Sequence, residues 1–279
     1  MNISKNIHTF IGCDSDYAES RIAIFGAPFD STTSYRPGAR FASSAMRNES
    51  YGIETYSPYQ DKDLLDAEIF DCGDLELCFG SPESALNDIE KMTENIISDG
   101  KLPIMIGGEH LVTLGAVRAA VKKYPDLRIV HFDAHADLRD DYLGQKLSHA
   151  CVMRRCHELL GDGKIFQFGI RSGDREEFLW GKEHVYTNRF DFSGIERIKE
   201  KTGDRPVYFT LDLDVLDPSC FCGTGTPEAG GVSYNELIKA IEKVSELNVI
   251  GLDINELSPT LDQSGASTAL ACKLLREIL

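Results

Sequence analysis

The chain has 279 residues, 42% of them hydrophobic and 27% charged, which is ordinary for a soluble globular protein of one large α/β domain or two smaller ones. Its net charge of -16 at pH 7 argues against nucleic acid and anionic membrane surfaces as partners, and is compatible with a small cationic substrate. No apolar run approaches the ~18 residues of a membrane span, and residues 1–13 lack the features of a secretory signal or presequence, so we expect a cytoplasmic protein.

Short apolar runs alternate with amphipathic segments along most of the chain. Strands are predicted at residues 21–27, 68–72, 102–106, 128–133, 165–170, 206–211 and 249–254. Helices are predicted at residues 82–99, 111–124, 148–160, 174–182, 234–244 and 267–279, and residues 183–203 show no clear pattern. This alternation calls for a mostly parallel sheet covered on both faces, a three-layer α/β/α fold. Because no linker or repeat interrupts it, we expect residues 1–279 to form a single domain.

The segment 131–137 closes the apolar run 127–132 with Asp133, His135 and Asp137 at alternate positions. In an extended segment these three side chains project to one side and can converge on one ion. The alternative is a polar strand end whose side chains simply meet water.

Two further clusters of ligand-type residues follow other predicted strands. His110 comes after the Gly107-Gly108 turn, and Asp212 and Asp214 follow the strand 206–211. Taken alone, His110 is more typical of a polar helix start than of a metal ligand, and Asp212 and Asp214 are more typical of a turn. A parallel sheet brings the clusters to one edge, however, where four carboxylates need two divalent cations to stay ionised. Oxygen and imidazole ligands without thiolate favour manganese or a similar ion, and such a pair of ions indicates hydrolytic chemistry.

Glu256 and His149 are candidate substrate-binding and proton-transfer residues. Glu256 follows the strand 249–254 and could hold a cation in the fork geometry that suits guanidinium. His149 could relay protons near neutral pH. The alternatives are an exposed acid and a surface histidine.

These residues resemble the motifs of the ureohydrolases, the family of arginases and agmatinases, and resemble those of agmatinases most. The resemblance is carried by GGEH at 107–110, DAHAD at 133–137, SH at 148–149, DLDVLDP at 212–218, GTGTP at 223–227, GG at 230–231 and DINE at 253–256. It covers nearly the whole chain, and YRPGARF at 35–41 is similar to the family's loop at the substrate entrance.

The resemblance implies a binuclear manganese hydrolase, in which a metal-bridging hydroxide attacks the guanidinium carbon of agmatine to give putrescine and urea, a step of polyamine biosynthesis. It also implies a homo-oligomer, a trimer or hexamer. Carried over to this sequence, one ion takes His110, Asp133, Asp137 and Asp212, and the other takes Asp133, His135, Asp212 and Asp214. In the same way Glu256 and His149 bind the substrate, Asp137 passes a proton to the leaving amine, and His149 shuttles protons.

Arg139 leaves the substrate open. Arginases carry an asparagine at this place, which helps to hold the carboxylate of arginine, so Arg139 disfavours arginine and favours agmatine. An Arg139 that points inward would instead repel the distal amine of agmatine and suit a guanidino acid such as guanidinobutyrate. The further alternatives are a deacetylase of similar fold, which needs only one metal, and a homologue that has lost turnover.

Overall fold

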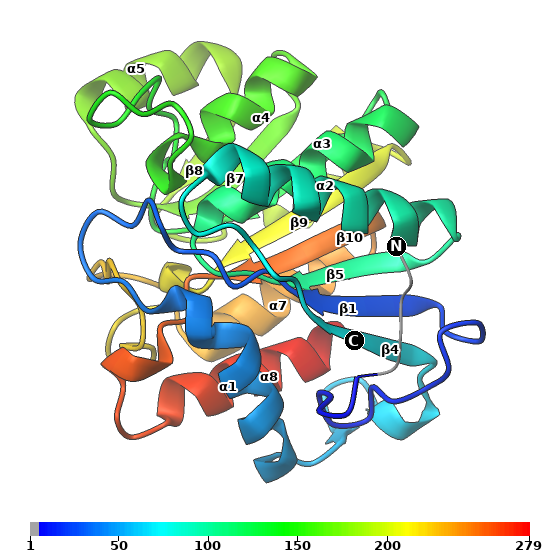
Figure 1. Ribbon diagram of the computed structural model, residues 1–279. Helices are drawn as coiled ribbons and strands as arrows, with labels where there is room; N and C mark the ends of the chain where they lie inside the picture. The colour runs from blue at the N-terminus through cyan, green and yellow to red at the C-terminus, as the bar shows by residue number, and fades with distance from the viewer. Residues whose placement is uncertain (1–5) are drawn as a thin grey trace.

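The computed structural model describes residues 6–279, and in that range its centre is an eight-stranded sheet in the order β4-β1-β5-β10-β9-β6-β7-β8 (Figure 1). Neighbouring strands of this sheet pair in parallel. The strands are β1 (Ile22–Gly26), β4 (Ile69–Asp74), β5 (Leu102–Ile106), β6 (Arg128–Phe132), β7 (Ile165–Ile170), β8 (Tyr186–Arg189), β9 (Pro206–Asp212) and β10 (Asn248–Asn255). Each predicted strand is present, and the parallel order confirms the predicted fold class.

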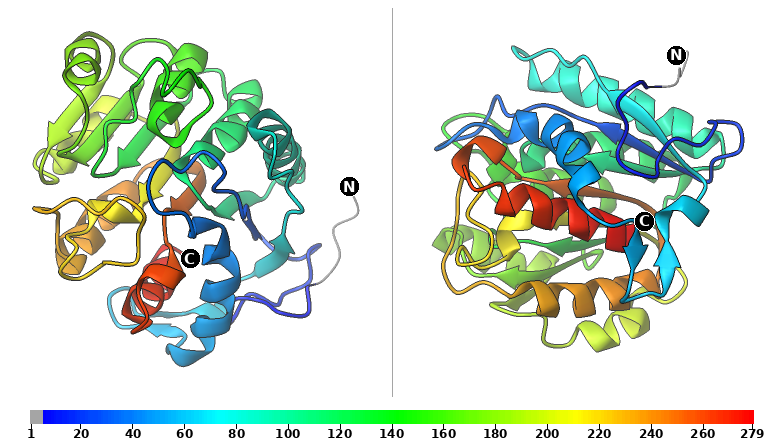
Figure 2. Two further views of the ribbon diagram at one scale, coloured as in Figure 1. Left: turned by 60° about the vertical axis from the view of Figure 1, so that its left-hand side comes forward. Right: turned by 90° about the horizontal axis from the view of Figure 1, so that it is seen from below.

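Helices cover both faces of the sheet, as the views in Figure 2 show. One layer consists of α2 (Pro82–Ser98), α3 (Thr113–Lys123), α4 (Val152–Leu160) and, near the β8 edge, α5 (Arg175–His184). The opposite layer consists of α1 (Ala42–Glu49), α6 (Ile198–Thr202), α7 (Tyr234–Ser245) and α8 (Ala266–Ile278). Strand β5 contributes Ile104 and Ile106 to one apolar core and Met105 to the other. A strand buried on both faces therefore reads as a continuous apolar run.

The helix boundaries follow from local capping. The Ser81 hydroxyl accepts a hydrogen bond from the amide of Ser84 at 3.2 Å, with Pro82 as the first helical residue of α2. Ser233 and Glu236 form a reciprocal capping box at the start of α7. Gly161 ends α4 with a φ of 87°, a backbone conformation that favours glycine.

Four elements were not predicted: α1, α6, β8 and a small hairpin of β2 (Tyr56–Ser57) and β3 (Lys62–Asp63). The sequence of α1 has only two apolar residue types, and β8 is a largely exposed edge strand without an apolar run. Periodicity cannot detect such segments, because tertiary contacts specify them. The eight cysteines all lie in the described range and are free thiols. No helix within residues 6–279 is long and apolar enough to cross a membrane.

The order of the sheet decides where polar residues meet. Strands β5, β10, β9 and β6 are consecutive neighbours and run in one direction. The loops that follow their carboxyl ends therefore lie together at one edge of the sheet, the usual place for ligands in such folds.

Candidate active site

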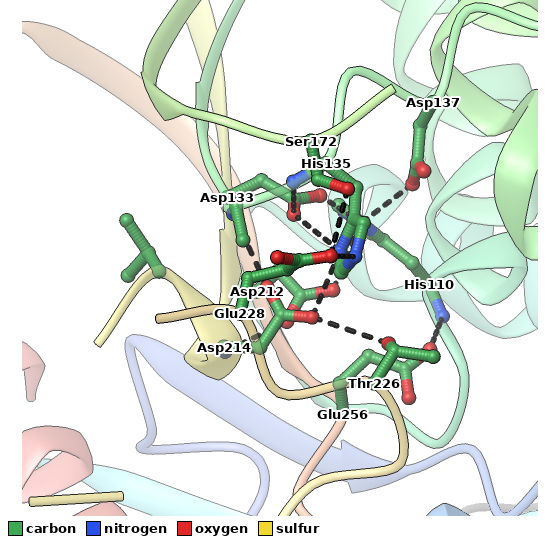
Figure 3. A network of polar contacts seen from close by, with 12 residues as sticks. His110, Asp133, His135, Asp137, Ser172, Asp212, Asp214, Thr226, Glu228 and Glu256 are labelled. Atoms are coloured by element: carbon green, nitrogen blue, oxygen red, sulfur yellow. Dashed lines mark hydrogen bonds and ion pairs between the residues drawn. The ribbon is translucent and has the colours of Figure 1, made fainter. Parts of the chain in front are cut away.

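His110 lies at the centre of one group of carboxylates at this edge. Its Nδ1 atom is 3.0 Å from Asp133 Oδ2, 3.2 Å from Asp137 Oδ2 and 3.3 Å from Asp212 Oδ2. The histidine is contributed by the turn after β5, Asp133 and Asp137 by the segment after β6, and Asp212 by the last position of β9. The structure thus brings together side chains from three separate sequence motifs (Figure 3).

His135 forms the centre of an adjoining group. Its Nδ1 atom is 3.0 Å from Asp214 Oδ2 and 3.5 Å from Asp133 Oδ1. Asp133 therefore lies between the two groups, with one carboxylate oxygen toward His110 and the other toward His135. This is the position that an anion shared by two cations would occupy.

The backbone that carries these ligands differs from the prediction of an extended segment. Strand β6 ends at Phe132, and Asp137 has a left-handed φ of 54°. The amide of Ala134 donates to Asp214 Oδ1 at 3.2 Å, and the amide of Ala136 donates to the carbonyl of Ser172 at 3.0 Å. Side chains converge here because the chain turns against neighbouring loops, so the predicted alternation along a strand was wrong.

The carboxylates are crowded and almost fully shielded from water. Asp133, Asp212, Asp214 and Asp137 are at most 6% exposed. Burial and the charges of Asp214 and Asp133 raise the pKa of Asp212 well above its usual value, and burial with the charge of Asp133 raises the pKa of Asp137 to about 7. Such a set holds protons unless cations balance it. Oxygen and imidazole donors in this number suit divalent metal ions, so the side chains fit the implied group.

Two residues that were not predicted to have roles position the ligands. His131 Nε2 is 2.8 Å from Asp133 Oδ2, and Thr210 Oγ1 is 2.8 Å from His110 Nε2 and donates to Asp253 Oδ1 at 2.6 Å. Partners of this kind fix the orientation of metal-ligating groups. His131 could have been found from its place two residues before Asp133 on the same strand face. Thr210 carries no such signal.

Glu256 is a buried carboxylate at the cleft. It is 7% exposed, its backbone is left-handed with a φ of 65°, and its Oε1 atom accepts a hydrogen bond from the amide of His110 at 2.8 Å. Burial and the charges of Glu109 and Asp214 raise its pKa well above the ordinary value. A cationic ligand beside Glu256 would restore its ionised form.

His149 lies where a short helical turn begins, close to the polar loop 29–41. Its Nε2 atom is 3.2 Å from Ser34 Oγ, and its amide donates to Thr32 Oγ1 at 3.2 Å. Its Nδ1 atom is buried and has no hydrogen-bond partner among residues 6–279. Burial, reinforced by the charge of His135, lowers the pKa of His149 to about 4. The imidazole is therefore neutral at pH 7.

A cleft of about 260 Å³ opens onto the cluster. Its lining includes the predicted residues His110, His135, Asp137, His149, Asp212, Asp214 and Glu256. Arg139 lines it as well, with Nη1 3.3 Å from Asp174 Oδ2 and Nε 3.3 Å from Glu177 Oε2. Its guanidinium also lies over the Tyr142 ring, 4.8 Å from the centroid. The charge of Arg139 is thus countered by two acids of the cleft wall.

Known proteins resemble this chain over nearly its full length. The sequence profile of the Arginase family matches residues 20–279. The agmatinase of Bacillus subtilis (strain 168) is 46% identical over 276 residues, covering 97% of this chain and 94% of the relative. The chain belongs to the arginase family. As a member of this family it is an enzyme of the ureohydrolase type, as the sequence motifs predicted.

Two other relatives extend the comparison. The solved structure of the agmatine ureohydrolase of Thermoplasma volcanium has a TM-score of 0.89 at 38% identity, covering 98% of this chain and 93% of that one. The guanidinobutyrase of Pseudomonas aeruginosa is 34% identical over 270 residues, covering 92% of this chain and 85% of the relative. The family therefore includes relatives with different substrates in their names.

Proposed function

We propose that this arginase-family enzyme hydrolyses agmatine to putrescine and urea at a binuclear manganese site. The observation that carries the choice of agmatine is the pairing of Arg139 with Asp174 and Glu177. A free arginine in the cleft would repel the distal amine of agmatine, whereas a paired one does not. The likeness to the agmatinase of Bacillus subtilis supports the same choice.

The His110 and His135 groups are the proposed metal ligands. The residues that would hold the two ions are His110, Asp133, Asp137 and Asp212 for one and Asp133, His135, Asp212 and Asp214 for the other. When bound, such ions lower the pKa of water from 15.7 towards about 7 and so supply hydroxide near neutral pH.

Three side chains of the cleft act on the substrate. The Glu256 carboxylate accepts charge-assisted hydrogen bonds from the guanidinium and fixes its orientation. As the bond from the guanidino carbon to the chain nitrogen breaks, Asp137 delivers the proton that the leaving amine requires. His149, neutral at pH 7 and in contact with Ser34 at the cleft mouth, takes up and returns protons from solvent.

The acidic wall of the cleft suits a cationic tail. Asp174 and Glu177 line the cleft, and Glu228, whose side chain is 43% exposed, lies beside it with Oε1 4.0 Å from His135 Nε2. These three acids outnumber the one cation on this wall, Arg139, which is itself paired with Asp174 and Glu177. An amine at the end of the substrate is therefore favoured over a carboxylate.

Urea release from three substrates tests the proposal. We expect the manganese-loaded protein to release urea from agmatine with a kcat/KM about 100-fold above that for arginine or guanidinobutyrate. Urea from guanidinobutyrate or arginine but not from agmatine would reassign the substrate and leave the ureohydrolase chemistry intact. Absence of urea with all three would contradict the proposed function. Glu256→Gln serves as the control that removes the guanidinium-binding charge.

A further inference from the structure

Three ligand-type side chains converge at a second place, outside the lining of the active-site cleft. His157 lies in the last turn of α4, His184 is the last residue of α5, and Asp162 lies on the loop between α4 and β7. His157 Nε2 is 2.7 Å from Asp162 Oδ1, and His184 Nδ1 is 2.6 Å from the same oxygen. Two imidazoles and one carboxylate thus point at one location.

The backbone holds this arrangement together. The amide of Gly161 donates to the carbonyl of His157 at 2.7 Å, and the amide of Gly163 donates to the carbonyl of His184 at 2.9 Å. Both glycines are left-handed, with φ of 87° and 70°, and they form the tight loop that places Asp162 between the helices. The three side chains are therefore brought together by backbone hydrogen bonds as well as by their own contacts.

The local electrostatics favour a cation. The carbonyl ends of α4 and α5 both face this place, and each carries a partial negative charge. The Asp162 carboxylate, which carries a negative charge at neutral pH as aspartates ordinarily do, lies between the two imidazoles.

We infer that His157, Asp162 and His184 form a second metal site, which binds zinc. Two imidazole nitrogens and one carboxylate oxygen leave a fourth position for water, a common tetrahedral zinc arrangement. Ligand atoms of tetrahedral zinc lie ~3.3 Å apart, given bonds of about 2.0 Å, so the present contacts must open slightly. Asp162 can move, since its side chain is 68% exposed. Imidazole suits zinc better than manganese, so this site should prefer zinc, whereas the carboxylate-rich cleft should prefer manganese.

The chain contains a reporter of this site in its single tryptophan, Trp180. The indole stacks on the His184 ring with centroids 4.1 Å apart, and the His157 ring meets it edge-on at 4.7 Å. An open-shell ion such as Ni²⁺ bound to both imidazoles quenches the emission of an indole in contact with them, whereas zinc does not. The fluorescence of Trp180 therefore reads out this site without reference to catalysis.

The test is a titration of nickel chloride into the manganese-loaded protein, followed by zinc chloride. We expect a saturable loss of Trp180 emission with a micromolar midpoint, and recovery of the emission as zinc displaces nickel. Quenching that is not saturable below ~1 mM nickel would exclude a specific site. Saturable quenching that zinc does not reverse would exclude zinc as the ion.

Variants locate the site. His157→Gln combined with His184→Gln should abolish the saturable quenching, and Asp162→Asn should raise its midpoint at least about tenfold. His8→Gln, a change of an exposed histidine elsewhere, should leave the midpoint unchanged. The response should persist in Asp133→Ala, and its loss there would assign the quenching to the active-site cleft. Circular dichroism verifies that each variant is folded, and unaltered quenching in folded Asp162→Asn would contradict the proposed ligand set.

Discussion

Asp133 faces more histidines than any other acid of the cluster. Its Oδ2 atom is 3.0 Å from His110 and 2.8 Å from His131, and its Oδ1 atom is 3.5 Å from His135. The other acids of the cluster each face one histidine. Asp133 is therefore the acid that faces the histidines of both groups.

We therefore predict that Asp133→Ala abolishes urea release and manganese binding together. The change removes one of the two carboxylates that are proposed to join both ions, and it leaves His110 and His135 without their shared partner. Manganese per chain, measured after dialysis by elemental analysis, should fall towards zero. Asp204→Ala, a change of an exposed carboxylate outside the cleft, is the control, and unchanged turnover in Asp133→Ala would refute the proposed site.

His149 should behave differently from the ligands. Its pKa of about 4 leaves the ring unprotonated at neutral pH, and its contacts are with Ser34 and Thr32 rather than with the carboxylate cluster. We predict that His149→Ala retains manganese while kcat for agmatine falls about 100-fold, the scale of lost acid-base assistance. Steady-state kinetics and metal analysis of the same sample check this. Loss of manganese would reassign His149 as a metal-site residue.

At the scale of the element, one carboxylate closes the loop 217–231. Asp217 Oδ1 accepts from the amide of Ser219 at 3.0 Å, and Oδ2 accepts from the amides of Gly230 and Gly231 at 2.9 and 3.0 Å. This loop carries Thr226 into the lining of the cleft. The two ends of the loop are thus tied to one side chain.

Asp217→Ala should lower the free energy of unfolding at pH 7 by about 1–2 kcal/mol. A hydrogen bond to a charged group contributes about 1.5–3 kcal/mol, and the partial exposure of Asp217 reduces this value. Hydrogen bonds from Ser219, then from Gly231 and Gly230, lower the pKa of Asp217 to about 2. The unfolded value is ~3.9, so the stabilisation is complete above that pH and is lost as the pH falls towards 2. Urea denaturation at pH 7, 5 and 3 should show the difference between the two proteins narrowing only at the lowest pH. Asp204→Ala, at a 97% exposed side chain, is the control.

At the scale of the whole molecule, the sequence predicted the fold and the site best where strands are buried and run in the same direction. Apolar runs such as 127–132 mark strands buried on both faces, and the ligand-type residues after them meet because parallel strands end at one edge. The arginase family membership and the ureohydrolase class were also predicted correctly from the motifs. Periodicity could not reveal β8, whose exposed position requires no apolar pattern, or the turn at Asp137 that replaces the predicted extended segment.

Other features depend on contacts between distant segments. The hydrogen bond between Thr210 and His110 joins residues 100 positions apart, and the pairing of Arg139 with Glu177 joins a loop to α5. No local pattern encodes such contacts. The single domain over residues 1–279, the cytoplasmic location and the homo-oligomer stay predictions.

Removal of metal should lower the stability of the whole molecule. Four buried carboxylates repel one another in the metal-free protein, and an ion that binds only the folded state at about 100 times its Kd stabilises it by about 2.7 kcal/mol. We expect the melting temperature of the EDTA-treated protein to fall by roughly 5–10 °C and to recover when manganese is added back. Differential scanning calorimetry measures both changes. An unchanged melting temperature would contradict the proposed coupling of metal binding to folding.

The left-handed backbone at Asp137 and Glu256 has a practical consequence for protein engineering. A side chain in this conformation costs of order 1–3 kcal/mol, which glycine would relieve. A library screened for heat resistance would therefore favour glycine at these two positions, and each such change would remove a carboxylate proposed to act on the substrate. Thermostable variants of this enzyme should be selected on urea release, with melting temperature as the second criterion.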